Sequence, residues 1–186
     1  MQLMSKPWLA AVMVYIALIL GSLPYGPVVV RWLRAGIGQG GFALAVNGVL
    51  AVAALLLSGW AVRRLDGRHL LLLLVPLAVV GMVTIWMDNP AERFHFLLYA
   101  GLGILMLMVW GHSPSSWAVP LSMVLAALVG GLDELVQHFL PMRVGDWRDV
   151  AMNAAGGTLG VWAAALLGQK RGPVDDGNER QRPLRK

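Results

Sequence analysis

The stretch Gly131–Gly160, GLDELVQHFLPMRVGDWRDVAMNAAGGTLG, concentrates polar and ionisable side chains between two strongly apolar segments. Charged residues make up only 13% of the whole chain, so this concentration costs free energy unless the groups pair with one another or bind something. Ionisable residues at the edge of a membrane span are by default candidates for a functional site. The polar members of the stretch include Asp133, Glu134, Gln137, His138, Arg143, Asp146, Arg148, Asp149 and Asn153.

The composition around this stretch predicts an all-α membrane protein. The sequence has 186 residues, is 58% hydrophobic and has a mean hydropathy of +0.66, well above the apolar share of ordinary soluble domains. We therefore expect a polytopic membrane helical bundle with about six transmembrane helices in one domain, residues 1–168. The absence of cysteine excludes a thiolate nucleophile, a disulfide framework and a cysteine metal site.

Apolar runs of about twenty residues, separated by short polar turns, mark the expected helices. Pro141 ends one helix inside the polar stretch, and Asp88-Asn89-Pro90 separates two earlier ones. Residues 28–33 are expected to continue the first helix as a kinked end, and Gly36–Gly41 to form a glycine-rich connection. The predicted spans are Trp8–Leu23, Phe42–Val62, Leu70–Met87, Ala91–Trp110, Trp117–Leu140 and Asp149–Gly168.

The distribution of positive charge predicts the orientation. With six spans both termini lie on one side, and that side carries ten Lys and Arg against five on the other. The positive-inside rule then places both termini in the cytoplasm and the polar stretch on the outer face. Residues 169–186 hold six of these basic residues and are rich in Gly, Pro and charge, which predicts a disordered cytoplasmic tail. A basic tail beside a span fixes orientation or contacts anionic lipid, so nucleic acid is not an expected partner.

Helical periodicity gathers the polar residues on a few faces, at 100° per residue. Gly156 and Gly160 form a GxxxG spacing, which lets a neighbouring helix approach closely. We expect this approach to bring the polar edge of the sixth helix against that of the fifth. The shared faces are Glu92, His95 and Tyr99 on the fourth helix, Asp133 with Gln137 and Glu134 with His138 on the fifth, and Asp149, Asn153, Gly156 and Gly160 on the sixth.

Glu134 is the member of this group that is hardest to explain by structure alone. It precedes the expected helix stop by six residues, which is roughly 9 Å inside the helix at ~1.5 Å per residue. A buried carboxyl group beside His95 suits general acid–base chemistry. His95 could instead be an interfacial histidine bonded to a carbonyl, and Asp133 and Asp149 could form an ion network with a loop arginine.

A divalent metal is a further alternative, because carboxylates and imidazoles are common metal ligands. The sequence contains no HExxH pattern, no P-loop and no Rossmann fingerprint. The expectation is therefore a site without a metal and without an organic cofactor. The residues that could supply metal ligands are His95, Asp133, Glu134, His138 and Asp149.

Two segments of the chain resemble the VanZ-like family of bacterial membrane proteins. They are ERFHFLLYAGLG (Glu92–Gly103) and DELVQHFLPMRVGDWRDVAMNAAGG (Asp133–Gly157). The resemblance covers residues 8–23 and 90–168, with the family core at about 90–168. It implies a multi-pass protein of the bacterial cytoplasmic (inner) membrane that presents a polar site to the cell envelope.

Two positions depart from the family pattern. Leu98 stands where some relatives have an acidic residue, which removes a charge from the site. Met142 stands where glycine usually lies, which alters the loop. The family is named for low-level resistance to the glycopeptide teicoplanin, a property that the resemblance does not carry over to this chain.

The expected function is recognition of an anionic envelope lipid or a lipid-linked glycan precursor, which would be the partner of the protein. In the alternative, the protein is a membrane enzyme acting on such a lipid, with Glu134 and His95 as catalytic residues that move a proton. A proton-coupled transporter is disfavoured, because the short spans show no broken-helix repeats. The expected ligand-binding residues are Glu92, Arg93, Tyr99, Asp133, Gln137, Arg143, Asp146, Arg148, Asp149 and Asn153.

Arg143 and Asp149 are expected to play different roles. Arg143 follows Pro141 in a short loop, where its guanidinium, like those of Arg93 and Arg148, could hold a phosphate. Asp149 lies in the first turn of the expected sixth helix, where a carboxylate can cap free backbone N–H groups. Loss of Arg143 is therefore expected to weaken binding, and loss of Asp149 to weaken the fold.

Overall fold

A computed structural model of the chain describes residues 5–111, 115–140 and 146–168. Every regular element in these ranges is helical, which confirms the predicted all-α bundle. Five segments are long and apolar enough to cross a membrane, and α1, with 17 residues, is slightly shorter. The elements are α1 (Lys6–Ser22), α2 (Gly26–Arg64), α3 (Gly67–Ile85), η1 (Pro90–Arg93), α4 (Phe94–Met108), α5 (Ala118–His138) and α6 (Trp147–Gly168).

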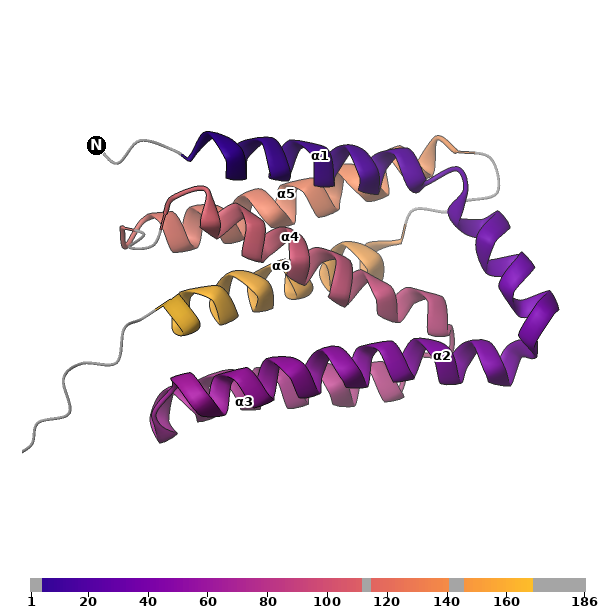
Figure 1. The fold of residues 1–186 in the computed structure, drawn as a ribbon. Helices are drawn as coiled ribbons and strands as arrows, with labels where there is room; N and C mark the ends of the chain where they lie inside the picture. Colours follow the sequence, from indigo (N-terminus) through magenta and orange to yellow (C-terminus); the bar gives the residue numbers. More distant parts are fainter. Residues whose placement is uncertain (1–4, 112–114, 141–145, 169–186) are drawn as a thin grey trace, which may run out of the picture.

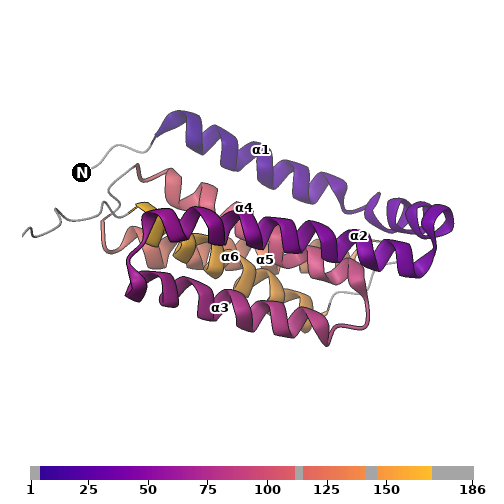
Figure 2. The same cartoon turned by 60° about the horizontal axis from the view of Figure 1, so that its bottom comes forward.

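The helices run back and forth along one axis (Figure 1). α4, α5 and α6 form the centre of the bundle, α1 covers one side of it, and the hairpin of α2 and α3 covers the other; Figure 2 shows the same separation of α1 from the hairpin. α1 begins and α6 ends at one end of the bundle. At the opposite end α4 begins, α5 ends and α6 begins. We call this opposite end the site end.

Helix α2 bends sharply at Gly38, and this bend replaces the expected loop. Gly38 has φ 71° and ψ 168°, while the residues on both sides are helical. A positive φ of this size is open to glycine and strained for residues with a Cβ atom. Residues 26–37 therefore form a separate helical arm, which leaves the bundle axis before the longer part of α2 returns along it (Figure 1). The predictions of a kinked first helix and of a loop at Gly36–Gly41 were wrong at this point.

Glycine allows α4 and α6 to pack with their backbones in contact. A Cβ atom at Gly160 would overlap the carbonyl oxygen of Ala100, and one at Gly156 would lie 2.8 Å from the carbonyl oxygen of Phe96. Gly103 of α4 meets the backbone of α6 in the same way. The GxxxG pair therefore approaches α4 most closely, rather than the polar edge of α5 as the sequence had indicated. Small residues at such positions stabilise membrane helix pairs through close van der Waals contact.

The outer helices contact this centre over smaller areas. Val12 and Ile19 of α1 pack against a buried group on α4 that includes Leu102, and the Tyr15 hydroxyl donates to the Leu98 carbonyl at 3.0 Å. The hairpin packs on the end of α6 through a second buried group. That group consists of Ala61, Leu65, Leu73, Ala163 and Leu166.

The start of the fourth span also differs from the prediction. Instead of one helix from Ala91, a 3₁₀ turn (η1) precedes α4, which begins at Phe94. The side chain of Asn89 accepts from the backbone N–H of Ala91 and so starts this turn. Glu92 lies in this turn and accepts from the side chain of Asn89 at 2.9 Å, whereas the His95 ring contacts Asn153 of α6, so the two side chains belong to different hydrogen-bonded groups.

Candidate functional site

The site end brings three helix ends into contact. α4 starts there with His95 and Tyr99, α5 ends there with Asp133, Glu134 and Gln137, and α6 starts there with Asn153. A Cβ atom at Gly130 would lie 2.6 Å from Cβ of Asn153 and 3.4 Å from the Tyr99 ring. Glycine at this position therefore lets both side chains approach α5. We call the six polar residues His95, Tyr99, Asp133, Glu134, Gln137 and Asn153 the polar cluster.

The polar cluster is buried. Asp133 and Glu134 are only 2% and 4% exposed, and Tyr99, Gln137 and Asn153 are buried at least as deeply. His95 is half-buried. Burying two neighbouring carboxyl groups is costly unless other groups compensate their charge or satisfy their oxygens. The hydrogen bonds within and around the cluster therefore determine whether this burial is tolerated.

Asn153 fixes the orientation and the tautomer of His95. Its side-chain N–H donates to the carbonyl oxygen of Gly130 at 3.3 Å, which turns its Oδ1 toward Nδ1 of His95 at 2.6 Å. An amide oxygen can only accept, so Nδ1 of His95 must carry the proton and donate it. In a neutral imidazole the other nitrogen, Nε2, then holds a free lone pair.

Each carboxyl group of the cluster also receives a hydrogen bond that orients it. The Tyr99 hydroxyl donates to Oδ2 of Asp133 at 2.9 Å. The Gln137 amide donates to Oε1 of Glu134 at 2.8 Å, and the backbone N–H of Asp146 donates to Oε2 at 3.3 Å. As a result one imidazole nitrogen of His95 and one oxygen from each of Asp133 and Glu134 lie within 4.8 Å of one another. Among the residues that the structure describes, these three are the group that could hold a metal ion.

Asp146, rather than Asp149, occupies the capping position of α6. It is the residue immediately before the helix, and its Oδ1 accepts from the backbone N–H of Arg148 at 2.9 Å, as expected for an N-cap. Asp149 is the third residue of the helix and half-buried. The sequence had assigned the cap to Asp149, because it placed the start of the helix two residues too late.

Glu92 and Arg93 belong to a second polar group on the neighbouring side of the site end. Arg93 donates to Oδ1 of Asn47 at 2.6 Å and to the carbonyl oxygen of Met87 at 2.6 Å. Asn89 joins Arg34 to Glu92, because it accepts from Arg34 at 2.7 Å and donates to Glu92 at 2.9 Å. We call Arg34, Asn47, Asn89, Glu92 and Arg93 the arginine rim.

The sequence had not identified three members of this rim. Arg34 entered the prediction only as a charge in the orientation count, and Asn47 and Asn89 were not considered as site residues. The Asn-Pro turn at Asn89 was the one visible signal, since it marks a chain reversal. Nothing local indicated that Arg34, 55 residues earlier, would meet that turn.

The remaining predicted residues lie around these two groups or outside the described ranges. Arg148 is exposed, and its backbone N–H contributes to the cap of α6. His138 is exposed on the last turn of α5, with its ring edge-on to Phe139 at a centroid distance of 5.6 Å, so it does not join the polar cluster. Arg143 lies outside the described residues, and its expected role stays a prediction.

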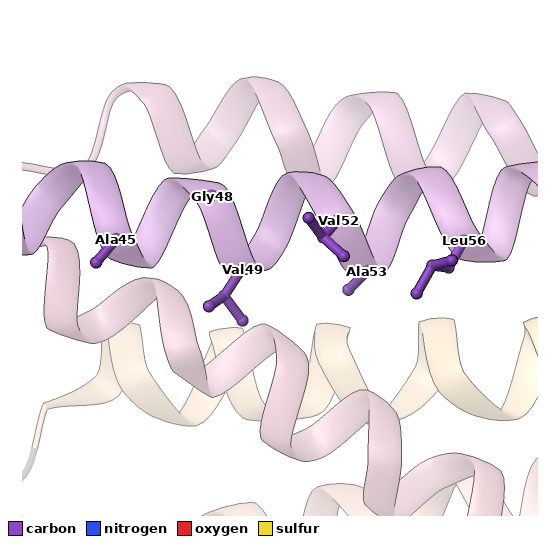
Figure 3. A pocket seen from close by; sticks show the side chains of 6 residues that line it. All are labelled: Ala45, Gly48, Val49, Val52, Ala53 and Leu56. Carbon is purple, nitrogen blue, oxygen red and sulfur yellow. The ribbon is translucent and has the colours of Figure 1, made fainter.

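Two apolar cavities lie along α2. The first, of 540 Å³, is lined by side chains on the face of α2 that is turned toward α4 and α6 (Figure 3). The second, of 480 Å³, lies between α2 and α3 and includes Arg93 and Asn47 of the arginine rim in its lining. The lining of the first cavity contains no residue of the polar cluster or of the arginine rim, so the second cavity is the one that adjoins the candidate site.

Comparison with protein families gives one match. The model of a family described as VanZ/LLP1 matches residues 42–168. The match includes most of α2 and all of α3, which the resemblance seen in the sequence did not cover, and it begins after α1. Comparisons with curated proteins and with solved structures give no match. Because the matched range covers well over half of the chain and contains both the polar cluster and most of the arginine rim, this chain belongs to the VanZ/LLP1 family.

Proposed function

We propose that this VanZ-like membrane protein recognises an anionic envelope lipid or a lipid-linked glycan at its site end. The observation that carries the proposal is the charge of the arginine rim. Arg34 and Arg93 donate to uncharged oxygens, and within the described ranges neither forms an ion pair with a carboxylate. Both side chains are half-buried, where a positive charge favours an anionic partner. A guanidinium is especially suited to a phosphate, which it can bind with two hydrogen bonds.

The cavity beside Arg93 supports a lipid as the source of that phosphate. Its lining combines Arg93, Asn47 and Thr84 with apolar residues of α2 and α3. From Asn47 to Ala54 the lining follows α2 over about 10 Å, at ~1.5 Å per residue. A phospholipid or polyprenyl phosphate has the same division, with a charged phosphate at one end and an apolar chain beyond it.

A matched pair of arginine variants tests this proposal. Arg93→Gln removes the charge beside the cavity, whereas Arg31→Gln removes an exposed charge from the arm of α2. Losing one charge-assisted contact costs about 1.5–3 kcal/mol, which is a roughly ten- to hundredfold weaker affinity. We expect native mass spectrometry in mild detergent to show preferential retention of phosphatidylglycerol over phosphatidylcholine by the wild-type protein and by Arg31→Gln. Arg93→Gln should lose that preference.

One further sample sharpens this test. A competition between a polyprenyl phosphate and phosphatidylglycerol distinguishes a glycan carrier from a bulk phospholipid as the ligand. At low concentration, only the preferred lipid should displace the other from the protein. Equal lipid retention by both arginine variants would overturn the assignment of the arginine rim. Retention that is equal for phosphatidylcholine and phosphatidylglycerol in the wild-type protein would overturn the proposal itself.

We further propose that both termini lie in the cytoplasm and that the site end faces the outer side of a bacterial inner membrane. The basic turn between α2 and α3, with Arg63, Arg64 and Arg68, lies at the same end of the bundle as the start of α1 and the end of α6 (Figure 1). The sequence adds six more basic residues after α6, in 169–186, and such a positive excess is typical of the cytoplasmic side. A fluorescent reporter fused after Lys186 should be active, and alkaline phosphatase at the same position inactive. The reverse result would invert the orientation.

A membrane enzyme acting on the same lipid is the second candidate. The observation that favours it is the proximity of His95 and Glu134, whose nitrogen and oxygen lie within 4.8 Å. One bridging water or a small movement would let such a pair transfer a proton. Incubation with the retained lipid, followed by mass spectrometry of the products, separates the two candidates. An enzyme gives a new product that Glu134→Gln does not form although it still binds the lipid, whereas a binding protein gives no product.

A further inference from the structure

We propose that His95, Asp133 and Glu134 form a binding site for one divalent transition-metal cation, with Zn²⁺ as the best match. This inference is independent of lipid recognition, because it uses different residues from the arginine rim. The sequence had argued against a metal on the ground that no HExxH pattern occurs. The structure assembles the ligands differently, with His95 on α4 and both carboxylates on α5.

The geometry of the three donor atoms fits a small cation after a modest contraction. All three lie within 4.8 Å of one another, so the centre of their triangle is at most about 2.8 Å from each atom. Zn²⁺ binds histidine nitrogen and carboxylate oxygen at about 2.0–2.2 Å. Side-chain movements of several tenths of an ångström would therefore close the site. One nitrogen and two oxygen donors suit Zn²⁺ or Mn²⁺ better than the all-oxygen sites of Ca²⁺ and Mg²⁺.

The hydrogen bond of His95 to Asn153 leaves one ring nitrogen available to a metal. Because Nδ1 donates to Asn153, the lone pair of the neutral ring is on Nε2. In known metal sites the ligating histidine almost always donates its other N–H to an oxygen acceptor, which holds the ring in place. Asn153 performs that role here, and its own donation to Gly130 keeps its oxygen turned toward the ring.

The carboxylates have the same kind of support. Tyr99 donates to one oxygen of Asp133, and Gln137 donates to Glu134. Hydrogen bonds to ligating carboxylates orient them toward a metal. A cation would also relieve the repulsion between two carboxylates that are 2% and 4% exposed. Three protein ligands leave a fourth position for water or a substrate oxygen, which is the pattern of a catalytic zinc site.

Metal binding is tested on the full-length protein in detergent, with its affinity tag removed and after treatment with a chelator. We expect isothermal titration calorimetry to show one Zn²⁺ per chain, and Co²⁺ to give the visible absorption of a four- or five-coordinate ion. Glu134→Gln and His95→Gln should weaken Zn²⁺ binding at least tenfold. His138→Gln is the matched control, because it removes an exposed histidine of the same helix end and should leave the affinity unchanged.

Several outcomes would overturn the metal site. They are a wild-type protein that binds no Zn²⁺, a Glu134→Gln protein that binds as the wild type does, and an equal loss in His138→Gln. If the cluster variants do not fold, the wild-type titration and the Co²⁺ spectrum still decide the question. Arg93→Gln separates this inference from the proposed function, since it should lose lipid preference while keeping the metal.

Discussion

Glycine has opposite surroundings in the centre of this bundle and in its outer hairpin. In α4 and α6, Gly103 and Gly160 meet the backbone of the other helix, so that no Cβ atom could be accommodated without movement. In α2 and α3, Gly48 and Gly81 have no atom within 4 Å of the place where a Cβ would lie. The same residue type therefore allows close helix packing in the centre and faces open space in the hairpin.

Polar residues follow the same division. Asn153 in the centre is fully buried and hydrogen-bonded to two helices, whereas Asn47 in the hairpin is exposed and contacts one arginine. The central helices thus hold their side chains in fixed positions, as a site for chemistry or for a metal requires. The hairpin leaves its polar groups beside a cavity, which suits a partner that arrives through the membrane.

The largest expected difference between the two regions concerns glycine replacement. Gly160→Leu places a large side chain where the Ala100 backbone lies and should destabilise the fold by more than about 3 kcal/mol, since overpacking of a close contact forces the helices apart. Gly48→Leu fills open space on the hairpin and should leave stability unchanged or slightly higher, because leucine is the better helix former. Thermal unfolding in detergent measures both. Similar losses in the two variants would show that the hairpin is as tightly packed as the centre.

Loss of a buried amide should come next. Asn153→Ala leaves the His95 N–H without its acceptor and removes the side-chain bond to the Gly130 carbonyl, and an unsatisfied buried group costs about 1–3 kcal/mol. Asn47→Ala removes an exposed contact and should cost about 0.5 kcal/mol or less. Chemical unfolding in mixed micelles can compare the pair. A larger loss for Asn47→Ala would mean that the arginine rim, rather than the polar cluster, holds the site end together.

Helix capping should give a smaller effect. Asp146→Ala removes the cap of α6, which is typically worth about 0.5–2 kcal/mol. Asp149→Ala should cost less through capping, because Asp149 is the third residue of the helix and Asp146 already accepts from the Arg148 N–H. The melting temperatures of Asp146→Ala and Asp149→Ala show which of the two residues caps α6. If Asp149→Ala has the lower melting temperature, Asp149 rather than Asp146 caps α6, as the sequence had indicated.

The smallest effect is expected at the corresponding cap of α3 in the hairpin. The backbone N–H and the ring of His69 donate to Asp66 and lower the pKa of its carboxyl group below the ordinary value of 3.8. A carboxyl group with a lowered pKa in the folded state stabilises the protein above its unfolded pKa, and the contribution is lost as the pH falls through the folded value. Asp66→Asn keeps a capping side chain but removes the charge.

The melting temperature of Asp66→Asn should therefore be slightly below that of the wild-type protein at pH 6. The difference should narrow as the pH falls below about 4, because the wild-type carboxyl group then becomes protonated. A difference that stays constant between pH 6 and pH 3 would show that the charge of Asp66 does not contribute. Because the side chain is fully exposed, any contribution is reduced by solvent screening.

The sequence by itself determined the class of the protein and the part of the chain in which most of the buried polar residues lie. Long apolar runs, a low charge content and proline stops are local properties, so they predicted a helical membrane bundle without knowledge of any contact. The same holds for Glu134, whose distance from the helix end predicted its burial. The family resemblance between Asp133 and Gly157 was also visible, because it depends on residues at fixed spacings along the chain.

Only the tertiary structure decided which polar residues meet. The rotation of each helix about its axis and the angle at which helices cross are set by packing, and they decide that Glu92 bonds to Asn89 while His95 bonds to Asn153. The bend at Gly38 brought Arg34 to Asn89, and Gly130 let Asn153 reach His95. These contacts join residues 23 to 58 positions apart. Periodicity along a single helix carries no information about the helix on the other side of such a contact.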